Sequence, residues 1–233
     1  MEPSARLKAI AKQVEPYQRI ADIGSDHAYL PVWMIKNKKI SFAIAGEIQP
    51  GPLEAARRTI REAGVEERVA ARLGDGLQVV EPGEVEVAVI AGMGGAAIRG
   101  IMERSSLVRD SLSRVVCQPM TGAAGLREWL TNNAWRINAE DLVLEDGRLY
   151  EIIVAESGRS QPIDPLLLEI GPLLWQQRHP LLIEQLLRLK RQYQERVDEM
   201  TNSHTEVVKL RRQNYLEKIC VLEERMKWLR VVE

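Results

Sequence analysis

Four acidic or glycine-rich segments follow apolar runs in the N-terminal part of the chain. The first reads Asp22-Ile23-Gly24-Ser25-Asp26-His27, and Glu47 comes 23 residues after Gly24. The third is Gly74-Asp75-Gly76-Leu77, and the fourth is Gly92-Met93-Gly94-Gly95. If each apolar run is a parallel strand, all four segments lie at one edge of the sheet, where open α/β proteins bind their ligands.

These segments have the chemistry of an adenosine-containing cofactor site. The carboxylate of Glu47 can accept hydrogen bonds from both ribose hydroxyls, and Asp75 can accept one from the amino group of adenine. The first turn has one glycine, with Asp26 and Ala28 where a dinucleotide fingerprint has further glycines, which disfavours binding of NAD or of a P-loop phosphate. An acidic loop is better suited to the amino group and sulfonium of S-adenosylmethionine.

Each of these residues also has an ordinary structural explanation. A carboxylate at a strand end usually caps a turn, and paired glycines usually form one. A single histidine such as His27 is more often a packing or capping residue than a catalyst. The segments occur in order at the ends of four successive predicted strands, and this conjunction favours the cofactor site.

The elements that would position these residues alternate between two patterns. Alternation of short β-type runs with amphipathic stretches indicates βαβ units and a parallel sheet, hence an α/β fold. The predicted strands are Arg19–Ile23, Ser41–Glu47, Val69–Leu73, Val85–Ala91 and Arg114–Cys117. The predicted helices are Leu30–Asn37, Pro52–Ala63, Ala96–Arg104 and Gly122–Asn132.

A hairpin and a linker are predicted after this alternation. Two β-rich runs, Ile137–Leu144 and Leu149–Ala155, flank Asp146-Gly147, a strong tight-turn signal. The stretch from Ser157 to Pro165 is rich in Ser, Gly and Pro, a composition typical of linkers. We therefore expect a Rossmann-like domain over residues 1–158, and a linker and helical domain over residues 159–233.

The C-terminal part carries two heptad patterns. Apolar residues recur at spacings of three and four over Leu182–Met200 and again over Val208–Leu229, with a pause at Asn202-Ser203-His204. An antiparallel coiled-coil hairpin of two helices satisfies both patterns. Arg212 is the one polar position in the second seam, where it either fixes the register or reaches outward to a ligand.

Composition excludes several classes of protein. The chain has 233 residues, 45% hydrophobic and 28% charged, with a net charge of −1, so a globular protein without a globally basic surface is expected. Its 2 cysteines have no CxxC spacing, which excludes a zinc framework and favours a reducing, cytoplasmic setting. Neither a membrane span nor a signal peptide is indicated, and we expect a monomer without a metal.

The motifs together resemble the bacterial tRNA adenine-22 N1-methyltransferases, which are class I S-adenosylmethionine enzymes with a Rossmann-like domain and a C-terminal coiled-coil hairpin. The resemblance covers nearly the whole chain. The class I glycine is replaced by Asp26, and Gly92-Met93-Gly94-Gly95 replaces the Asn/Asp-Pro-Pro-aromatic segment of many N-methyltransferases, departures that the family shares. The motifs that carry the resemblance are Ala21–Pro31, Ala45–Glu47, Gly74–Leu77, Ala91–Gly95, Gln118–Met120 and Glu145–Glu151.

The resemblance implies roles for individual residues. Residues 24–27 would contact the methionine part of S-adenosylmethionine, Glu47 its ribose, and Asp75 with Gly76 its adenine. The predicted cofactor-binding set is Asp22, Gly24, Ser25, Asp26, His27, Glu47, Ile48, Asp75, Gly76, Leu77, Gly92, Met93 and Gly94. The predicted catalytic residues are His27, Tyr29, Met93 and Gln118. Apart from the resemblance, the basic residues expected to meet tRNA phosphates, or else to form solvated helix faces, are Lys36, Lys38, Arg188, Lys190, Arg191, Lys209, Arg211 and Arg212.

Three functions compete at this point. The first is methylation of N1 of adenine 22 in tRNA, with tRNA as partner. The second keeps the fold and the cofactor but transfers the methyl group to a small molecule or a protein. The third is a non-catalytic RNA-binding or scaffold protein on the same fold, which the intact Asp26, Glu47 and Asp75 disfavour.

Overall fold

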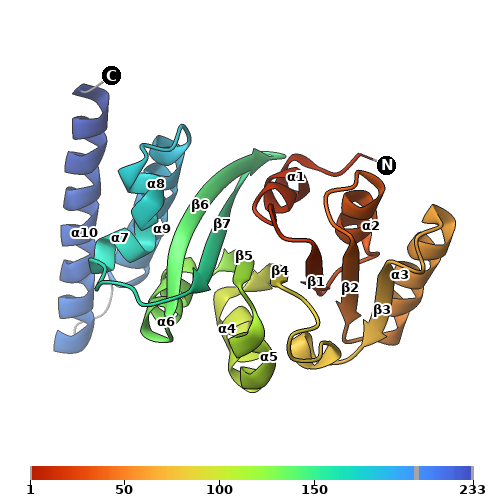
Figure 1. The fold of residues 1–233 in the computed structure, drawn as a ribbon. Coiled ribbons are helices and arrows are strands. Elements are labelled where there is room, and N and C mark those ends of the chain that lie inside the picture. Colours follow the sequence, from red (N-terminus) through yellow and green to blue (C-terminus); the bar gives the residue numbers. More distant parts are fainter. Residues whose placement is uncertain (1, 202–204, 232–233) are drawn as a thin grey trace. The chain divides into compact units, whose positions relative to one another are not determined.

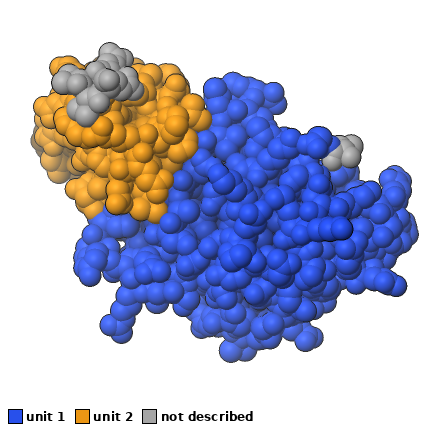
Figure 2. Space-filling view, turned by 45° about the horizontal axis from the view of Figure 1, so that its top comes forward, with its two compact units in different colours: residues 1–163 blue, residues 164–233 orange. Residues whose placement is uncertain are grey.

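The computed structural model describes residues 2–201 and 205–231. The chain divides into two compact units, residues 1–163 and residues 164–233, which are coloured separately in Figure 2. The predicted pause at Asn202-Ser203-His204 lies outside the described residues.

Unit 1 is built on one seven-stranded sheet with the order β3-β2-β1-β4-β5-β7-β6 (Figure 1). The first five strands in the chain pair in parallel, and β7 pairs antiparallel with both β5 and β6. This confirms the predicted α/β sheet with a terminal hairpin. The strands are β1 (Arg19–Ile23), β2 (Phe42–Glu47), β3 (Val69–Leu73), β4 (Val87–Gly94), β5 (Arg114–Thr121), β6 (Trp135–Glu145) and β7 (Arg148–Ser157).

Helices cover both faces of this sheet, α1 to α3 on one side and α4 to α6 on the other (Figure 1). The strand order reverses between β1 and β4, because the chain first winds outward to β3 and then returns to continue on the other side of β1. Such a switch point is where doubly wound folds bind ligands. The helices are α1 (Ala5–Lys12), α2 (Tyr29–Lys36), α3 (Pro50–Ala63), the 3₁₀ turn η1 (Gly76–Val79), α4 (Gly95–Arg104), α5 (Ser106–Ser111) and α6 (Ala123–Asn132).

Local sequence explains most of these elements. In α3 the residues Leu53, Ala56 and Ile60 are buried on one face, and Gly64 ends the helix with φ at 66°. Both features agree with the predicted amphipathic helix. The strands β4 and β5 run beyond the predicted ends at Ala91 and Cys117, because bulges after Ala91 keep the two strands paired as far as Gly94 and Thr121.

Helix α1 was not predicted. Its signals are present in the sequence, since Ser4 is the N-cap and its side chain accepts a hydrogen bond from the Leu7 backbone N–H. Ile10 and Ala11 are buried on the inner face of the helix. The many charges of this segment obscured the helical pattern, and the helix lies beside the carboxyl edge of the parallel strands.

A buried ion network joins α6 to the hairpin. The Arg127 side chain is fully buried, and its guanidinium lies 2.6 Å from a carboxylate oxygen of Glu140 on β6 and 2.6 Å from one of Glu151 on β7. Burial acts to lower the pKa of Arg127, but the two carboxylates outweigh burial and hold this pKa above its ordinary value. The network fixes the hairpin whose far end approaches α1.

Unit 2 contains a pair of long antiparallel helices, as the heptads predicted. Lys190 forms an ion pair with Glu223, while Tyr193, further along the first helix, packs on Tyr215, earlier in the second. Two short helices before the pair were not predicted. The four helices of the unit are α7 (Pro165–Ile170), α8 (Pro172–Gln176), α9 (Leu182–Glu199) and α10 (Glu206–Val231). Their buried seam includes Leu182, Leu186, Leu189, Tyr193, Val197, Ile219, Leu222, Met226 and Leu229.

Membrane-spanning helices and metal-binding clusters are both absent from residues 2–201 and 205–231. No helix in these ranges combines the length and the apolar composition needed to cross a membrane. In the same residues, no group of three or more His, Cys, Asp or Glu side chains is arranged to hold a metal ion.

Candidate active site at the carboxyl edge of the sheet

Asp22, at the end of β1, is a buried carboxylate. It is 5% exposed, and the Ser25 hydroxyl donates a hydrogen bond of 2.8 Å to Oδ2. Burial raises the pKa of Asp22 to about 6, with a further increase from Glu47, while the Ser25 hydrogen bond and the charge of Arg6 act in the opposite direction. Because a buried anion is costly without a counterion, the Asp22 carboxylate is suited to bind a cationic group of a ligand.

A strained turn follows Asp22. Asp26, His27 and Ala28 have φ of 39°, 72° and 57°, so three consecutive residues with side chains adopt the left-handed region. Each costs on the order of 1–3 kcal/mol and persists only where its surroundings hold it. Glu47 does so, because its Oε1 accepts a hydrogen bond of 2.6 Å from the Asp26 backbone N–H. Strain of this kind is typical of ligand-binding turns.

Glu47, at the end of β2, is the second buried carboxylate of the edge. It is 6% exposed, and burial raises its pKa while the Asp26 backbone hydrogen bond lowers it. Among the described residues, no donor bonds to its Oε2. Ile48, the next residue, is 63% exposed and forms part of the surface beside this carboxylate.

His27 and Tyr29 stand together at the start of α2. Their rings stack with centroids 5.3 Å apart and planes 16° from parallel. His27 Nε2 lies 3.5 Å from a carboxylate oxygen of Asp26. The imidazole and the phenol are both accessible, so either can contact a planar acceptor beside the cofactor edge.

The third strand ends in a carboxylate that has a partner. Asp75 accepts a hydrogen bond of 3.1 Å from a guanidinium nitrogen of Arg104, on α4, and both side chains are about half exposed. Gly76 has φ of 59°, and an added Cβ would meet Ile101 at 2.7 Å. Leu77 is buried beneath this turn. A ligand that hydrogen-bonds to Asp75 therefore competes with or joins Arg104.

Gly92, Met93 and Gly94 form the irregular end of β4. Gly92 has φ of 76°, and the pairing with β5 shifts on both sides of Met93. The Met93 methyl lies over Gly24, where an added Cβ would meet it at 2.4 Å. A side chain at position 24 would displace the flexible end of Met93, and the φ of 70° at Gly24 itself favours glycine.

Arg6 is a site residue that no sequence motif predicted. Its guanidinium donates to Gln118 Oε1 at 2.9 Å and lies 5.2 Å from the centre of the Tyr150 ring, and its backbone N–H donates to Glu145. Its Nε is buried and makes no hydrogen bond among the described residues, but it lies 3.8 Å from a carboxylate oxygen of Glu145. Local sequence carries no signal for this arginine, because only the fold brings α1 to the strand ends.

Gln118 differs from its expected position. The side chain is fully buried, and its Oε1 accepts hydrogen bonds from Arg6 and from the Gly92 backbone N–H at 3.2 Å. It does not line the cavity at the strand ends. Gln118 therefore fixes Arg6 and the end of β4 instead of contacting an acceptor directly.

A cavity of about 350 Å³ lies at the switch point between β1 and β4. The cavity brings together most of the predicted methionine-binding residues with Arg6. Glu47 and Asp75 lie at the neighbouring strand ends. His27 and Gly94 are not part of the lining. The residues around it are Arg6, Leu7, Asp22, Gly24, Ser25, Asp26, Tyr29, Leu30, Ala91, Gly92 and Met93.

The predicted RNA-binding lysines and arginines are distributed over both units. Lys36 lies at the end of α2, and Lys38 follows it with φ of 55°. In unit 2, Lys190 and Lys209 are engaged in ion pairs with Glu223 and Glu206, Arg191 and Arg211 are exposed, and Arg188 and Arg212 are partly buried.

Comparison with known proteins places this site in a family. Residues 3–153 match a family profile described as a methyltransferase domain. The chain is 38% identical over 186 residues to the tRNA (adenine(22)-N(1))-methyltransferase of Bacillus subtilis, covering 78% of each chain. Among solved structures, the Bacillus subtilis m1A22 tRNA methyltransferase superposes with a TM-score of 0.87 at 32% identity, covering 97% of this chain and 99% of that one.

A further relative carries a bound cofactor. A Streptococcus pneumoniae protein described as a candidate tRNA (m1A22) methyltransferase, in complex with S-adenosyl-L-methionine, has a TM-score of 0.86 at 30% identity and is covered completely. The doubly wound sheet, its acidic switch-point cavity and the domain match define a Rossmann-like methyltransferase. More narrowly, the chain belongs to the tRNA (adenine(22)-N(1))-methyltransferase family.

The raised pKa of Asp22 predicts how ligand affinity depends on pH. Only the ionised carboxylate attracts a cation, so affinity for S-adenosylmethionine should fall below about pH 6, approaching tenfold for each further pH unit. The free protein should respond in the opposite sense. Because the folded state binds the Asp22 proton more tightly than the unfolded state, stability falls as pH rises from about 4 through 6.

Calorimetric titration and thermal unfolding across this pH range test both statements. Asp22→Asn should weaken the binding of S-adenosylmethionine. The loss of affinity that remains at low pH should then follow the protonation of Glu47. The stability of the free variant should no longer fall as the pH rises from about 4 through 6. A wild-type affinity that stays level between about pH 5 and pH 7 would contradict the assignment of Asp22 to the cationic group.

Proposed function

We infer that this protein transfers a methyl group from S-adenosylmethionine to N1 of adenine 22 in tRNA. The observation that carries the inference is the placement of Arg6 and Asp22 in one cavity at the switch point, with Glu47 at the next strand end. A guanidinium and a carboxylate in one cavity match the carboxylate and the ammonium of an amino-acid group. Membership of the tRNA (adenine(22)-N(1))-methyltransferase family names the acceptor.

The residues present fit the cofactor along its length. Asp22 would hold the methionine ammonium, and the guanidinium of Arg6, which lines the same cavity, its carboxylate. Glu47 Oε2 would accept from the ribose hydroxyls, and Asp75 would meet the adenine, at a turn where Gly76 packs against Ile101. The cofactor supplies a methyl group made electrophilic by the neighbouring sulfonium.

Alignment is the main task left to the protein. Adenine N1 has an in-plane lone pair and carries no proton near neutral pH, so its attack needs no strong general base. We assign His27 and Tyr29 to the planar contact with the target adenine, because the Tyr29 ring lines the cavity and the His27 ring stacks on it. Met93 forms the facing wall, and Gln118 acts as a positioning residue through Arg6 and Gly92.

The direct test uses labelled S-adenosylmethionine and unmodified tRNA transcripts. A transcript with adenine at position 22 should gain the label at N1, and the same transcript with guanine at that position should gain none. Transfer to a small molecule or a protein but not to tRNA would favour the second of the three functions. Cofactor binding with no transfer to any acceptor would favour a non-catalytic RNA-binding protein.

We further propose that the helical unit binds the tRNA backbone, in a monomer that acts in the cytoplasm. Arg191 and Arg211 support this role best, because they are exposed and form no ion pair among the described residues. Lys190 and Lys209 already have carboxylate partners and contribute less. Removal of residues 159–233 should therefore weaken tRNA binding and leave S-adenosylmethionine binding unchanged.

Charge reversal tests the helical unit without removing it. Arg191→Glu with Arg211→Glu should raise the KM for tRNA by about tenfold or more, since each arginine that meets a phosphate contributes to the salt-dependent part of affinity. Cofactor affinity should stay unchanged. Arg68→Glu is the matched control, because Arg68 is exposed and precedes β3, at the edge of the sheet opposite the cofactor. Equal KM values in all three proteins would reject the RNA-binding role of these two arginines.

A further inference from the structure

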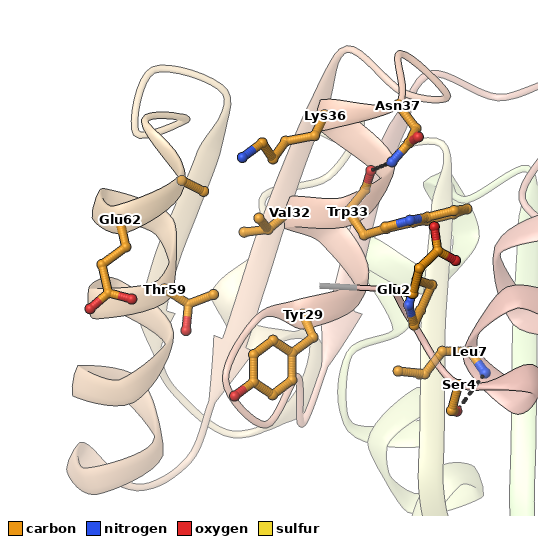
Figure 3. Close-up of a pocket in the computed structure, with 12 residues that line it drawn as sticks. Glu2, Ser4, Leu7, Tyr29, Val32, Trp33, Lys36, Asn37, Thr59 and Glu62 are labelled. Carbon is orange, nitrogen blue, oxygen red and sulfur yellow. Dashed lines mark hydrogen bonds between the residues drawn. The ribbon is translucent and has the colours of Figure 1, made fainter.

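A second and larger cavity lies on the outer side of α2. It is an open groove of about 710 Å³, bordered by α2, by α3 and by the N-terminal segment (Figure 3). The established family membership assigns nothing to it. Its lining residues are Glu2, Pro3, Ser4, Leu7, Tyr29, Val32, Trp33, Lys36, Asn37, Thr59, Glu62 and Ala63.

The groove has two sides, separated by α2. Figure 3 shows Tyr29, Val32 and Lys36 on the side toward α3, with Thr59 and Glu62 across from them. Trp33 lies on the other side of the helix, toward Glu2. The side toward α3 therefore offers an aromatic ring, an apolar floor, a cation and two polar groups.

This groove adjoins the cavity at the strand ends. Tyr29 and Leu7 line both spaces, and the other neighbour of Tyr29 is the ring of His27. From Tyr29 to Lys36 the helix rises about 10 Å, which is roughly the span of one to two nucleotides of an extended strand. A strand whose base enters the cavity at Tyr29 has its neighbouring nucleotides over this groove.

Some of the charged side chains in and near the groove form ion pairs, and others do not. Lys36 is exposed and has no ion-pair partner among the described residues, whereas Lys39 nearby is held by Glu15 at 2.7 Å. Glu2 is neutralised by Lys8 at 2.5 Å. Glu62 is exposed and forms no ion pair within the described chain, so its carboxylate is free to accept from hydroxyl or amino groups.

We propose that the side of this groove toward α3 binds a nucleotide next to the target adenosine in the tRNA strand, with its phosphate at Lys36 and its sugar or base at Thr59 and Glu62. The proposal rests on the proposed function, because it takes the substrate to be RNA. A cation alone would suit any anion. A cation, a free carboxylate and an aromatic ring in the lining of one groove, beside the cavity at the strand ends, fit the phosphate, the hydroxyls and the base of a nucleotide.

Lys36→Gln tests the phosphate contact in the full-length protein. The Kd for tRNA should rise by roughly threefold to tenfold, and the slope of log Kd against log salt should lose about 0.7 to 1 of its magnitude. The affinity for S-adenosylmethionine should not change. Lys12→Gln is the matched control, since it removes one exposed lysine of the same unit that does not line the groove, and it should leave the Kd for tRNA unchanged.

Photo-cross-linking locates the strand. A tRNA carrying a photoreactive 4-thiouridine at the position before or after the target adenosine should cross-link to the peptide Tyr29–Asn37 or to the facing stretch of α3. Adenosine monophosphate, as the free form of the same chemistry, should bind far more weakly than tRNA and should not protect these peptides.

The outcomes separate the groove from the function. If the wild-type protein methylates tRNA but Lys36→Gln has an unchanged Kd and salt slope, the groove proposal is overturned and the function stands. Binding of free adenosine monophosphate as tight as that of tRNA, and dependent on Lys36, would instead identify a free-nucleotide site and overturn the RNA assignment. If the wild-type protein methylates no tRNA, the proposed function fails first.

Discussion

Glu47→Ala should reduce the affinity for S-adenosylmethionine by about 10²- to 10⁴-fold. A hydrogen bond to a charged group contributes roughly 1.5–3 kcal/mol, and under the proposed function the carboxylate would make two such bonds to the ribose. The loss has a second source in this protein. Oε1 of Glu47 holds the backbone N–H of Asp26, so alanine also releases the strained turn that carries His27.

Glu47→Gln separates these two contributions. Glutamine keeps an oxygen for the Asp26 N–H but removes the negative charge, so its affinity should fall between those of the wild type and the alanine variant. Glu54→Ala, an exposed change on α3, serves as the control and should bind the cofactor normally. Calorimetry gives the affinities, and a Glu47→Ala protein that is folded and binds as tightly as the wild type would remove Glu47 from the site.

Arg127→Met should destabilise the protein by about 3–5 kcal/mol. Removing one partner of a buried ion network is strongly destabilising, and here two buried carboxylates, Glu140 and Glu151, would each lose a guanidinium that lies 2.6 Å away. Urea unfolding measures the loss as a lower midpoint. Because the strands β6 and β7 also carry Glu145 and Tyr150 to Arg6, cofactor affinity should weaken as well.

The triple variant Arg127→Met, Glu140→Gln, Glu151→Gln distinguishes uncompensated charge from lost packing. Removing the two carboxylates with the arginine should recover a large part of the stability, since neutral amides cost less to bury than ions. If the single variant unfolds at the wild-type urea concentration, other groups stabilise the buried carboxylates and Arg127 is not their essential counterion.

The sequence by itself determined the architecture and the order of the cofactor edge. Strand and helix periods are local properties, and the carboxyl ends of parallel strands must lie at one edge, so Asp22, Glu47, Asp75 and Gly92 could be placed together from their positions in the chain. The heptads likewise predicted the pairing of α9 with α10, because a seam of apolar residues has to be buried.

Only the tertiary structure decided which side chains complete the site. Arg6 reaches Gln118 across 112 residues of sequence, and no local pattern encodes a contact at that separation. The same holds for Arg104 at Asp75 and for the bond from Glu47 to the Asp26 backbone. The structure also shows that Gln118 is buried outside the cavity lining and bonded to Arg6 and Gly92, which the sequence did not indicate. Such contacts depend on how helices pack against the sheet, and that packing is set by the whole core at once.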